Sequence, residues 1–203
     1  MDDFKLKTTP AIDKQLKRQV RLSWMIDQVT IGDCKDMMRF LPNTCENVVD
    51  LGCGTGRVSV ILQQQPQLAD AKFWLVDGNY DTGIGHYGVY DDEEARFYNT
   101  KEITEECCDI NGLTNYEYIT MNDKFEWDQY PSDIDFLFSV RSVGCHWPLR
   151  LHNDSLQRVL RKGAVCVFMN QDILGDIPPF FQVLVETTEI IQRRPLIVLR
   201  YNP

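Results

Sequence analysis

The chain has 203 residues, of which 43% are hydrophobic and 25% charged, and this is the composition of a folded globular domain rather than a disordered chain. Its formal net charge is −9, which excludes a surface built to bind the phosphates of long nucleic acid through clustered Lys and Arg. No apolar run approaches the ~20 residues of a membrane helix, and the first residues lack the pattern of a secretory signal. We therefore expect a cytoplasmic protein with no membrane partner.

The seven cysteines are an odd number, and none of them lies in a CxxC pair or at the Cys/His spacing of a zinc site. Four of them lie in or beside apolar segments, namely Cys45, Cys53, Cys145 and Cys166. Small apolar thiols of this kind suit a reducing compartment. We predict reduced, mostly buried thiols and no metal site.

The N-terminal part is predicted to be helical over about residues 10–40. Apolar side chains recur there at every fourth position, which marks one face of a helix. These residues are Ile12, Leu16, Val20 and Trp24. A second short helix is expected over Cys34–Phe40, ending before Leu41-Pro42-Asn43. The dense basic stretch Lys14–Arg21 has helical spacing, so we interpret it as a solvated face.

Three glycines at alternate positions follow an apolar pair and an acid in the run Val48-Val49-Asp50-Leu51-Gly52-Cys53-Gly54-Thr55-Gly56-Arg57. The apolar residues 58–62 then indicate a helix. A buried strand that ends in a glycine loop at a helix start presents bare backbone N–H groups to a ligand. The spacing is Gly-x-Gly-x-Gly, and Arg57 stands where a dinucleotide-binding loop has its third glycine. The alternative interpretation of the glycines is an ordinary tight turn.

The run from Asp50 to Gly56 resembles the nucleotide-binding loop of the class I S-adenosylmethionine-dependent methyltransferases. In that family the loop wraps the methionine end of the cofactor, and an acid at the end of the next strand holds the ribose hydroxyls. Here Phe73–Val76 is predicted to be that strand, and Asp77 ends it 27 positions after Asp50, where roughly 20 positions are usual in nucleotide folds. The resemblance implies an α/β fold of the Rossmann-like methyltransferase type. That fold has a doubly wound, mostly parallel sheet of the seven-stranded type with a C-terminal antiparallel hairpin.

The resemblance also suggests roles for two other segments of what we expect to be a single methyltransferase domain, residues 1–203. Residues 1–45 are expected to form a helical lid over the cofactor or substrate, with Trp24 as a candidate contact; simple packing against the sheet is the alternative. In family members a helix begins shortly after the second acid. Residues 78–99 instead show no regular spacing of apolar residues that would indicate a helix or a strand. We therefore predict an inserted loop there. The four adjacent acids at 91–94 are expected at a helix start.

The rest of the chain alternates between helical and strand patterns, as expected for a doubly wound sheet. The predicted elements are a helix over Thr100–Asn111, strands over Tyr116–Thr120 and Ile134–Val140, a helix over Asn153–Leu160 broken by Lys162-Gly163, and a strand over Ala164–Met169. The strand at 134–140 is expected to be central, because its apolar run is nearly continuous. After Pro178-Pro179, residues 182–191 and 195–201 are expected to form a closing antiparallel pair.

Ligands of open α/β sheets bind outside the carboxyl ends of the strands, where the predicted site residues gather. From the resemblance we expect S-adenosylmethionine to be bound by Asp50, Gly52, Cys53, Gly54, Gly56, Asp77, Gly78, Asn79, Met121, Asn122 and Ser139. The glycine loop would approach the cofactor through backbone atoms, and Asp50 would bind the methionine ammonium directly or through water. Asp77 would accept two ribose hydroxyls. Met121 and Asn122 would meet the adenine, and Ser139 would offer its carbonyl to the ammonium.

Residues 139–148 occupy the place where this family carries out substrate chemistry. The Asn/Asp-Pro-Pro-aromatic motif of amide and adenine methylation is absent, and so is the Pro-Cys pair that serves attack on cytosine. The pattern Ser-x-x-Ser-x-Gly-x-His-Trp-Pro faintly resembles small-molecule and sugar O-methyltransferases. His146 is the predicted catalytic base, because a neutral imidazole can take a hydroxyl proton at pH 7, with a structural histidine as the alternative. Arg141 and Trp147 are predicted to bind the substrate.

The sequence therefore predicts an S-adenosylmethionine-dependent methyltransferase with a small-molecule acceptor, most plausibly a hydroxyl oxygen. His86 and His152 are lesser candidates for the base. Two alternatives remain open: a nucleotide-cofactor oxidoreductase of the same fold, which Arg57 disfavours, and a non-catalytic partner subunit that retains the fold. The acceptor and the oligomeric state are not specified by the residues.

Overall fold

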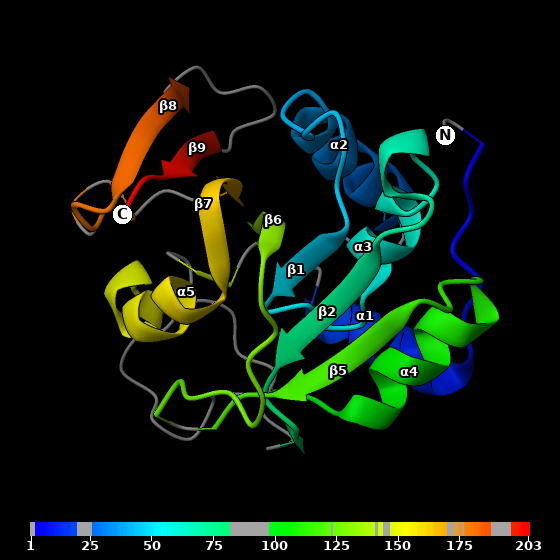
Figure 1. Ribbon diagram of the computed structural model, residues 1–203. Helices are drawn as coiled ribbons and strands as arrows, with labels where there is room; N and C mark the ends of the chain where they lie inside the picture. The colour runs from blue at the N-terminus through cyan, green and yellow to red at the C-terminus, as the bar shows by residue number, and fades with distance from the viewer. Residues whose placement is uncertain are drawn as a thin grey trace.

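The computed structural model describes residues 3–19, 26–81, 98–122, 124–140, 142–143, 147–169, 173, 175, 177–187 and 196–203. Seven strands form one sheet in the order β5-β2-β1-β6-β7-β9-β8 (Figure 1). These strands are β1 (Asn47–Leu51), β2 (Lys72–Asp77), β5 (Tyr116–Thr120), β6 (Ile134–Val140), β7 (Leu160–Met169), β8 (Phe181–Thr187) and β9 (Leu196–Tyr201). The helices are α1 (Pro10–Gln19), α2 (Ile26–Met38), α3 (Arg57–Leu62), α4 (Lys101–Ile110) and α5 (Asn153–Val159), with 3-10 turns at Pro66–Leu68 and Leu149–His152.

The sheet is parallel from β5 through β7 and antiparallel at its C-terminal end. β1 pairs in parallel with β2 and β6, β2 with β5, and β6 with β7, whereas β9 runs antiparallel to both β7 and β8. β6 is the middle strand of the order, as its apolar run predicts. The fold class is therefore the predicted one, a Rossmann-like sheet with a closing antiparallel pair.

Alternate residues of the central strands fill two separate cores, because successive side chains of a strand point to opposite faces of the sheet. Val48 of β1 belongs to the core shared with α2 and α3, whereas Val49 and Leu51 belong to the core under α5. In Figure 1, α2, α3 and α4 lie on one side of the sheet and α5 lies on the other. Asp50 has the same parity as Val48, so its carboxylate faces α3.

The N-terminal helices differ in their bounds from the prediction. Ile12 and Leu16 are buried against α4, which confirms the predicted face of the first helix. Val20 and Trp24 lie outside the described residues. The second helix begins at Ile26 and ends at Met38 rather than covering Cys34–Phe40, because its buried positions start one turn and more before Cys34.

The C-terminal half differs at one boundary. β7 begins at Leu160, directly after α5, so Lys162-Gly163 does not separate the helix from the strand. Instead the register against β6 shifts between the pairs Ile134–Leu160 and Phe136–Val165, and Gly163 takes a φ of 88° in this bulge. The glycine is needed for the bulge and not for a break.

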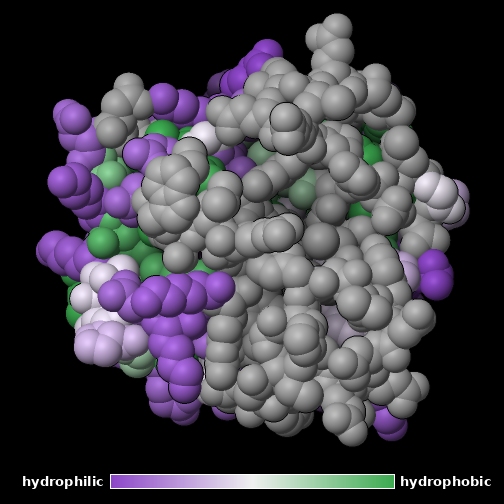
Figure 2. All heavy atoms as spheres, turned by 180° about the vertical axis from the view of Figure 1, so that it is seen from behind, coloured by the Kyte–Doolittle hydropathy of each residue, from purple (hydrophilic) through white to green (hydrophobic). Residues whose placement is uncertain are grey.

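The predicted insertion begins and ends in a two-stranded ribbon. β3 (Tyr80–Asp81) pairs antiparallel with β4 (Tyr98–Asn99). The acids at 91–94 and His86 lie outside the described residues. No helix within the described part of the chain has the length and hydropathy needed to cross a membrane. In the reverse view, the described surface side chains are mostly hydrophilic, with a small hydrophobic group among them at the left (Figure 2).

Candidate cofactor site

The glycine loop connects β1 to α3 and is hydrogen-bonded to the end of β2. The N–H groups of Gly52 and Cys53 both donate to the carbonyl of Val76, at 2.8 and 3.2 Å. Gly52, Gly54 and Gly56 have φ values of 74°, 54° and 71°, in the left-handed region that favours glycine. A Cβ on Gly52 would also collide with the side chain of Ser142, which follows β6. The loop is therefore closely packed against the strand ends where the cofactor is predicted to bind.

Asp77 faces the glycine loop directly. One carboxylate oxygen accepts the N–H of Gly54 at 2.6 Å, and the other accepts the N–H of Gly78 at 2.8 Å. Burial raises the pKa of Asp77 to about 6, although the two N–H groups oppose this shift. Each carboxylate oxygen has two lone pairs, so both oxygens can accept a further hydrogen bond from a hydroxyl.

Asp50 lies below the loop in a buried polar cluster. It is only 3% exposed, and its Oδ2 accepts the hydroxyl of Ser59 at 2.8 Å. Burial raises the pKa of Asp50 to about 7, against the opposing effects of Ser59 and the Arg57 guanidinium. Arg57 Nε in turn donates to Thr30 Oγ1 at 3.1 Å, which ties α2 to the start of α3. Arg57 is thus a buried partner of this cluster, a role that its sequence position alone does not indicate.

The loop predicted to meet adenine uses its side chains internally. The N–H of Met121 donates to the carbonyl of Asp77 at 2.8 Å, and Met121 is buried. Asn122 Oδ1 accepts the N–H groups of Lys124 and Glu126, and its Nδ2 donates to Glu126. The Asn122 amide therefore holds the turn, and its contact with adenine stays a prediction.

Asn79 also has a local partner. Its Oδ1 accepts the N–H of Lys101 at 2.9 Å in the first turn of α4, although the side chain itself is exposed. An amide oxygen in this place satisfies one of the free N–H groups of a helix start. The Asn79 side chain therefore caps α4, and its contact with the cofactor stays a prediction.

Ser139 connects the end of β6 to the end of β1. Its hydroxyl donates to the carbonyl of Leu51 at 2.8 Å and accepts the N–H of Val143 at 3.1 Å. These two bonds fix the start of the segment that is predicted to carry the substrate chemistry. Of the three residues predicted there, Arg141 and His146 lie outside the described residues, and Trp147 is half-buried.

Trp147 packs on an aromatic group and bonds to the segment that follows β6. Its backbone N–H donates to the carbonyl of Ser142 at 3.3 Å, and its indole ring packs against the Phe125 ring with centroids 5.2 Å apart. The ring of His152 meets the same Phe125 edge-on at 5.3 Å. His152 is fully buried, and neither ring nitrogen has a hydrogen-bond partner in the structure. Burial lowers its pKa to about 4, so the imidazole is neutral at pH 7 and packs as an apolar ring.

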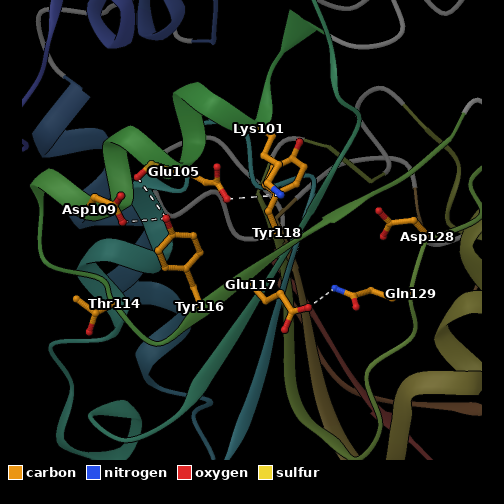
Figure 3. A pocket seen from close by; sticks show the side chains of 9 residues that line it. All are labelled: Lys101, Glu105, Asp109, Thr114, Tyr116, Glu117, Tyr118, Asp128 and Gln129. Carbon is orange, nitrogen blue, oxygen red and sulfur yellow. Dashed lines mark hydrogen bonds and ion pairs between the residues drawn. The ribbon is translucent and has the colours of Figure 1, made fainter.

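An open groove of about 590 Å³ lies beside β5 and α4, and its lining is rich in carboxylates (Figure 3). These acids have partners within the protein: Asp109 accepts the Tyr116 hydroxyl at 2.9 Å, and Glu117 accepts Gln129 Nε2 at 2.5 Å. Figure 3 shows both pairs pointing toward each other rather than into the groove. Among the described residues, no group of His, Cys, Asp and Glu is arranged to hold a metal ion.

Two residues of the site have no signal in the sequence. Asn99 of β4 and Thr104 of α4 both donate to the carbonyl of Gly54, at 2.7 and 2.6 Å. They are 45 and 50 positions from Gly54 in the chain. Only the folded arrangement brings them to the loop.

No protein-family model matches the chain, and no curated protein is similar to it in sequence. Solved structures are similar in fold. An S-adenosylmethionine-dependent methyltransferase from Aquifex aeolicus is 15% identical with a TM-score of 0.60, over 96% of this chain and 98% of that one. Phosphoethanolamine N-methyltransferase 1 of Haemonchus contortus, in complex with phosphoethanolamine and S-adenosylhomocysteine, is 16% identical with a TM-score of 0.58, over 95% of this chain and 48% of that one.

Precorrin-6y C5,15-methyltransferase of Geobacter metallireducens is 14% identical with a TM-score of 0.53, over 87% of this chain and 88% of that one. At such identities the likeness shows the fold alone. The chain therefore has the fold of the class I S-adenosylmethionine-dependent methyltransferases, as the resemblance of Asp50–Gly56 implies.

Proposed function

We propose that this protein is an S-adenosylmethionine-dependent methyltransferase that binds its cofactor at the carboxyl ends of β1, β2 and β6. The observation that carries the proposal is the 2.6 Å hydrogen bond from the Gly54 N–H to Asp77 Oδ2. It brings the glycine loop and the carboxylate at the end of β2 into one site, as binding of a single adenosyl group requires. An ordinary tight turn would not need that carboxylate.

The donor and acceptor groups of the site fit the cofactor. Asp77 has free lone pairs for two ribose hydroxyls, and Gly52 leaves no Cβ between the loop and Ser142. Asp50 would offer its carboxylate to the methionine ammonium, directly or through water, and a cation there would favour the ionised form of this group with its raised pKa. When bound, S-adenosylmethionine supplies a methyl group activated by a positively charged sulfur.

We further propose a small-molecule acceptor that is methylated at a hydroxyl oxygen, in a cytoplasmic protein with no nucleic-acid partner. The acceptor would bind beside Trp147, with Arg141 available for an anionic group. His146 would take the hydroxyl proton while the oxygen forms its bond to the methyl carbon and the carbon–sulfur bond breaks. The support for these roles is the segment's position after β6, where Ser139 and Ser142 approach the glycine loop.

Isothermal titration of the wild type with S-adenosylhomocysteine tests the cofactor proposal. We expect binding by the wild type and a loss of at least about 30-fold for Asp77→Ala, because two hydrogen bonds to a carboxylate are removed. Glu117→Gln is the matched control, because the Glu117 side chain lines the groove beside β5, away from the glycine loop. This variant should bind S-adenosylhomocysteine with the affinity of the wild type. No binding by the wild type ends the proposal.

The same titration with NAD separates the oxidoreductase alternative, which requires NAD to bind in place of S-adenosylhomocysteine. The non-catalytic alternative requires cofactor binding without turnover. Incubation of the protein with radiolabelled S-adenosylmethionine and a cell extract tests this second alternative, because label in small molecules demonstrates transfer. A His146→Ala variant with an unchanged pH–rate profile would remove His146 from the chemistry.

A further inference from the structure

The carbonyl of Gly54 is the centre of a buried hydrogen-bond network. Asn99 Nδ2 donates one hydrogen to it at 2.7 Å and the other to Thr104 Oγ1 at 2.6 Å. The Thr104 hydroxyl then donates its own hydrogen to the Gly54 carbonyl at 2.6 Å. The Gly54 carbonyl therefore accepts from both side chains, and Thr104 Oγ1 also lies 3.3 Å from the carbonyl of Thr100.

The other side of the same residue is held as well. The Gly54 N–H donates to Asp77, so the peptides before and after Gly54 are both fixed. Gly54 has a φ of 54°, in a region where only glycine moves freely. Rotation about φ would break the bond to Asp77, and rotation about ψ would break the bonds to Asn99 and Thr104.

Asn99 and Thr104 come from elements that are also anchored around Asp77. Asn99 ends β4, whose partner β3 begins directly after Gly78-Asn79. Tyr118 donates its hydroxyl to the carbonyl of Gly78 at 2.6 Å, and Asn79 caps α4, which carries Thr104. The two donors therefore have a fixed position relative to Asp77.

The Asn99 side chain carries one unusual feature. It is 2% exposed, and its Oδ1 has no hydrogen-bond partner among the residues that the structure describes. An unpartnered buried acceptor lowers stability. The amide nitrogen, in contrast, is engaged by the Gly54 carbonyl and by Thr104.

We propose that Asn99 and Thr104 are positioning residues of the cofactor site, which hold the Gly54 peptides in the orientation that binds the adenosyl group. This inference rests on the function proposed above. Neither residue touches the cofactor. Both act by fixing the loop before the cofactor binds, so that its ordering does not oppose binding.

Thr104→Val and Thr104→Ser are the matched pair that tests the proposal. Valine keeps the shape of threonine and removes the donor, whereas serine keeps the donor. We expect Thr104→Val to weaken S-adenosylhomocysteine binding about tenfold in isothermal titration, the effect of one lost hydrogen bond to the loop, and Thr104→Ser to bind like the wild type. Ser155→Ala in α5 controls for a general loss of stability, since its hydroxyl bonds to Phe125 on the other face of the sheet.

The pH dependence of binding distinguishes positioning from bulk stability. Binding should be lost at low pH as Asp77 is protonated, and the Gly54 N–H lowers the pKa of Asp77, which is about 6. A loosened Gly54 should therefore raise this pKa, and the midpoint, the pH at which half of the binding is lost, should rise with it. Asp50, Cys53 and Tyr118 also lie near this carboxylate, and they are unchanged in all variants. We expect the midpoint to rise in Thr104→Val and to stay in Thr104→Ser and Ser155→Ala.

Asn99→Asp provides a second route if Thr104→Val does not fold. It keeps the shape of the side chain but directs carboxylate oxygens at the Gly54 carbonyl, so binding at pH 7.5 should be weaker than in the wild type. Wild-type affinity and an unchanged midpoint in the folded variants overturn this inference alone. A wild type that binds no S-adenosylhomocysteine overturns the proposed function, and this inference with it.

Discussion

Two neighbouring parts of the carboxyl edge of the sheet bury titratable groups in opposite ways. Around the glycine loop, Asp50 and Asp77 are held among N–H, hydroxyl and guanidinium groups, and burial raises the pKa of each. Around α5, the buried His152 ring packs edge-on against Phe125, its nitrogens have no hydrogen-bond partner among the described residues, and burial lowers its pKa. Burial disfavours the charged form in both parts. Around the glycine loop, hydrogen bonds and the guanidinium partly offset this effect, as expected of a binding site, whereas the His152 ring packs as a neutral group.

The two parts should therefore respond oppositely to pH. A carboxyl whose folded pKa is raised contributes stability at low pH that is lost as the pH rises through that value. A histidine whose folded pKa is lowered contributes stability above its unfolded value, and this is lost as the pH falls toward the folded value. Asp50→Asn and His152→Leu test this contrast in pH dependence, and Gly52→Ala tests the packing of the glycine loop itself.

Gly52→Ala should have the largest effect, because it strains the loop itself. Alanine at a φ of 74° would collide with Ser142, so we expect a loss of about 4 kcal/mol in the free energy of unfolding, measured by urea denaturation, and no binding of S-adenosylhomocysteine. Gly163→Ala is the control, since its φ is 88° but no atom lies within 4 Å of the added Cβ. It should cost about 1 kcal/mol and leave binding intact. Equal costs for the two variants would contradict the close packing at Gly52.

Asp50→Asn should come next. Its folded pKa of about 7 lies above the unfolded value near 4, so wild-type stability should fall by about 3 kcal/mol on this account between pH 5 and pH 7.5. Asparagine does not titrate, and the variant should lose this part of the decline in urea denaturation at a series of pH values. Its affinity for S-adenosylhomocysteine should also fall. A decline as steep as that of the wild type would show that Asp50 ionises normally.

His152→Leu should have the smallest effect, and one of opposite sign. The folded pKa of about 4 lies below the unfolded value near 6.5, so the wild type loses about 2 kcal/mol on this account from pH 6.5 down to pH 4.5. Leucine removes this loss, and the variant should gain stability relative to the wild type as the pH falls. Cofactor affinity at pH 7.5 should not change. Parallel stability profiles for variant and wild type would mean that His152 has access to water.

The sequence predicts those parts of the site that depend on local order in the chain. The strand, the three glycines and the acid closing β2 are short-range patterns, and the structure places Gly54 and Asp77 in contact. The partners of Gly54, Asn99 and Thr104, come at the end of and after residues 78–99, whose apolar residues have no regular spacing. No rule of sequence spacing therefore connects them to the glycine loop. Asn122 shows the converse: its residue type suits an adenine edge, yet its side chain is used by a turn that cannot be anticipated from one residue.

The same distinction applies to the fold. The strand order follows from the family pattern and from apolar runs such as that of β6, whereas element boundaries depend on contacts between distant segments. β7 starts earlier than its apolar run because Leu160 pairs with Ile134 across the bulge. α2 starts earlier than predicted because Thr30 and Ile31 are buried in the folded chain, and Thr30 is paired with Arg57.

The ribbon of β3 and β4 makes the insertion modular. Asp81 and Tyr98 are cross-strand partners, so residues 82–97 connect two neighbouring points of the fold. A two-residue turn of the Asn-Gly type can join such partners. The sixteen positions between them can therefore be exchanged for that turn, or for a different loop, while β2 and α4 keep their places.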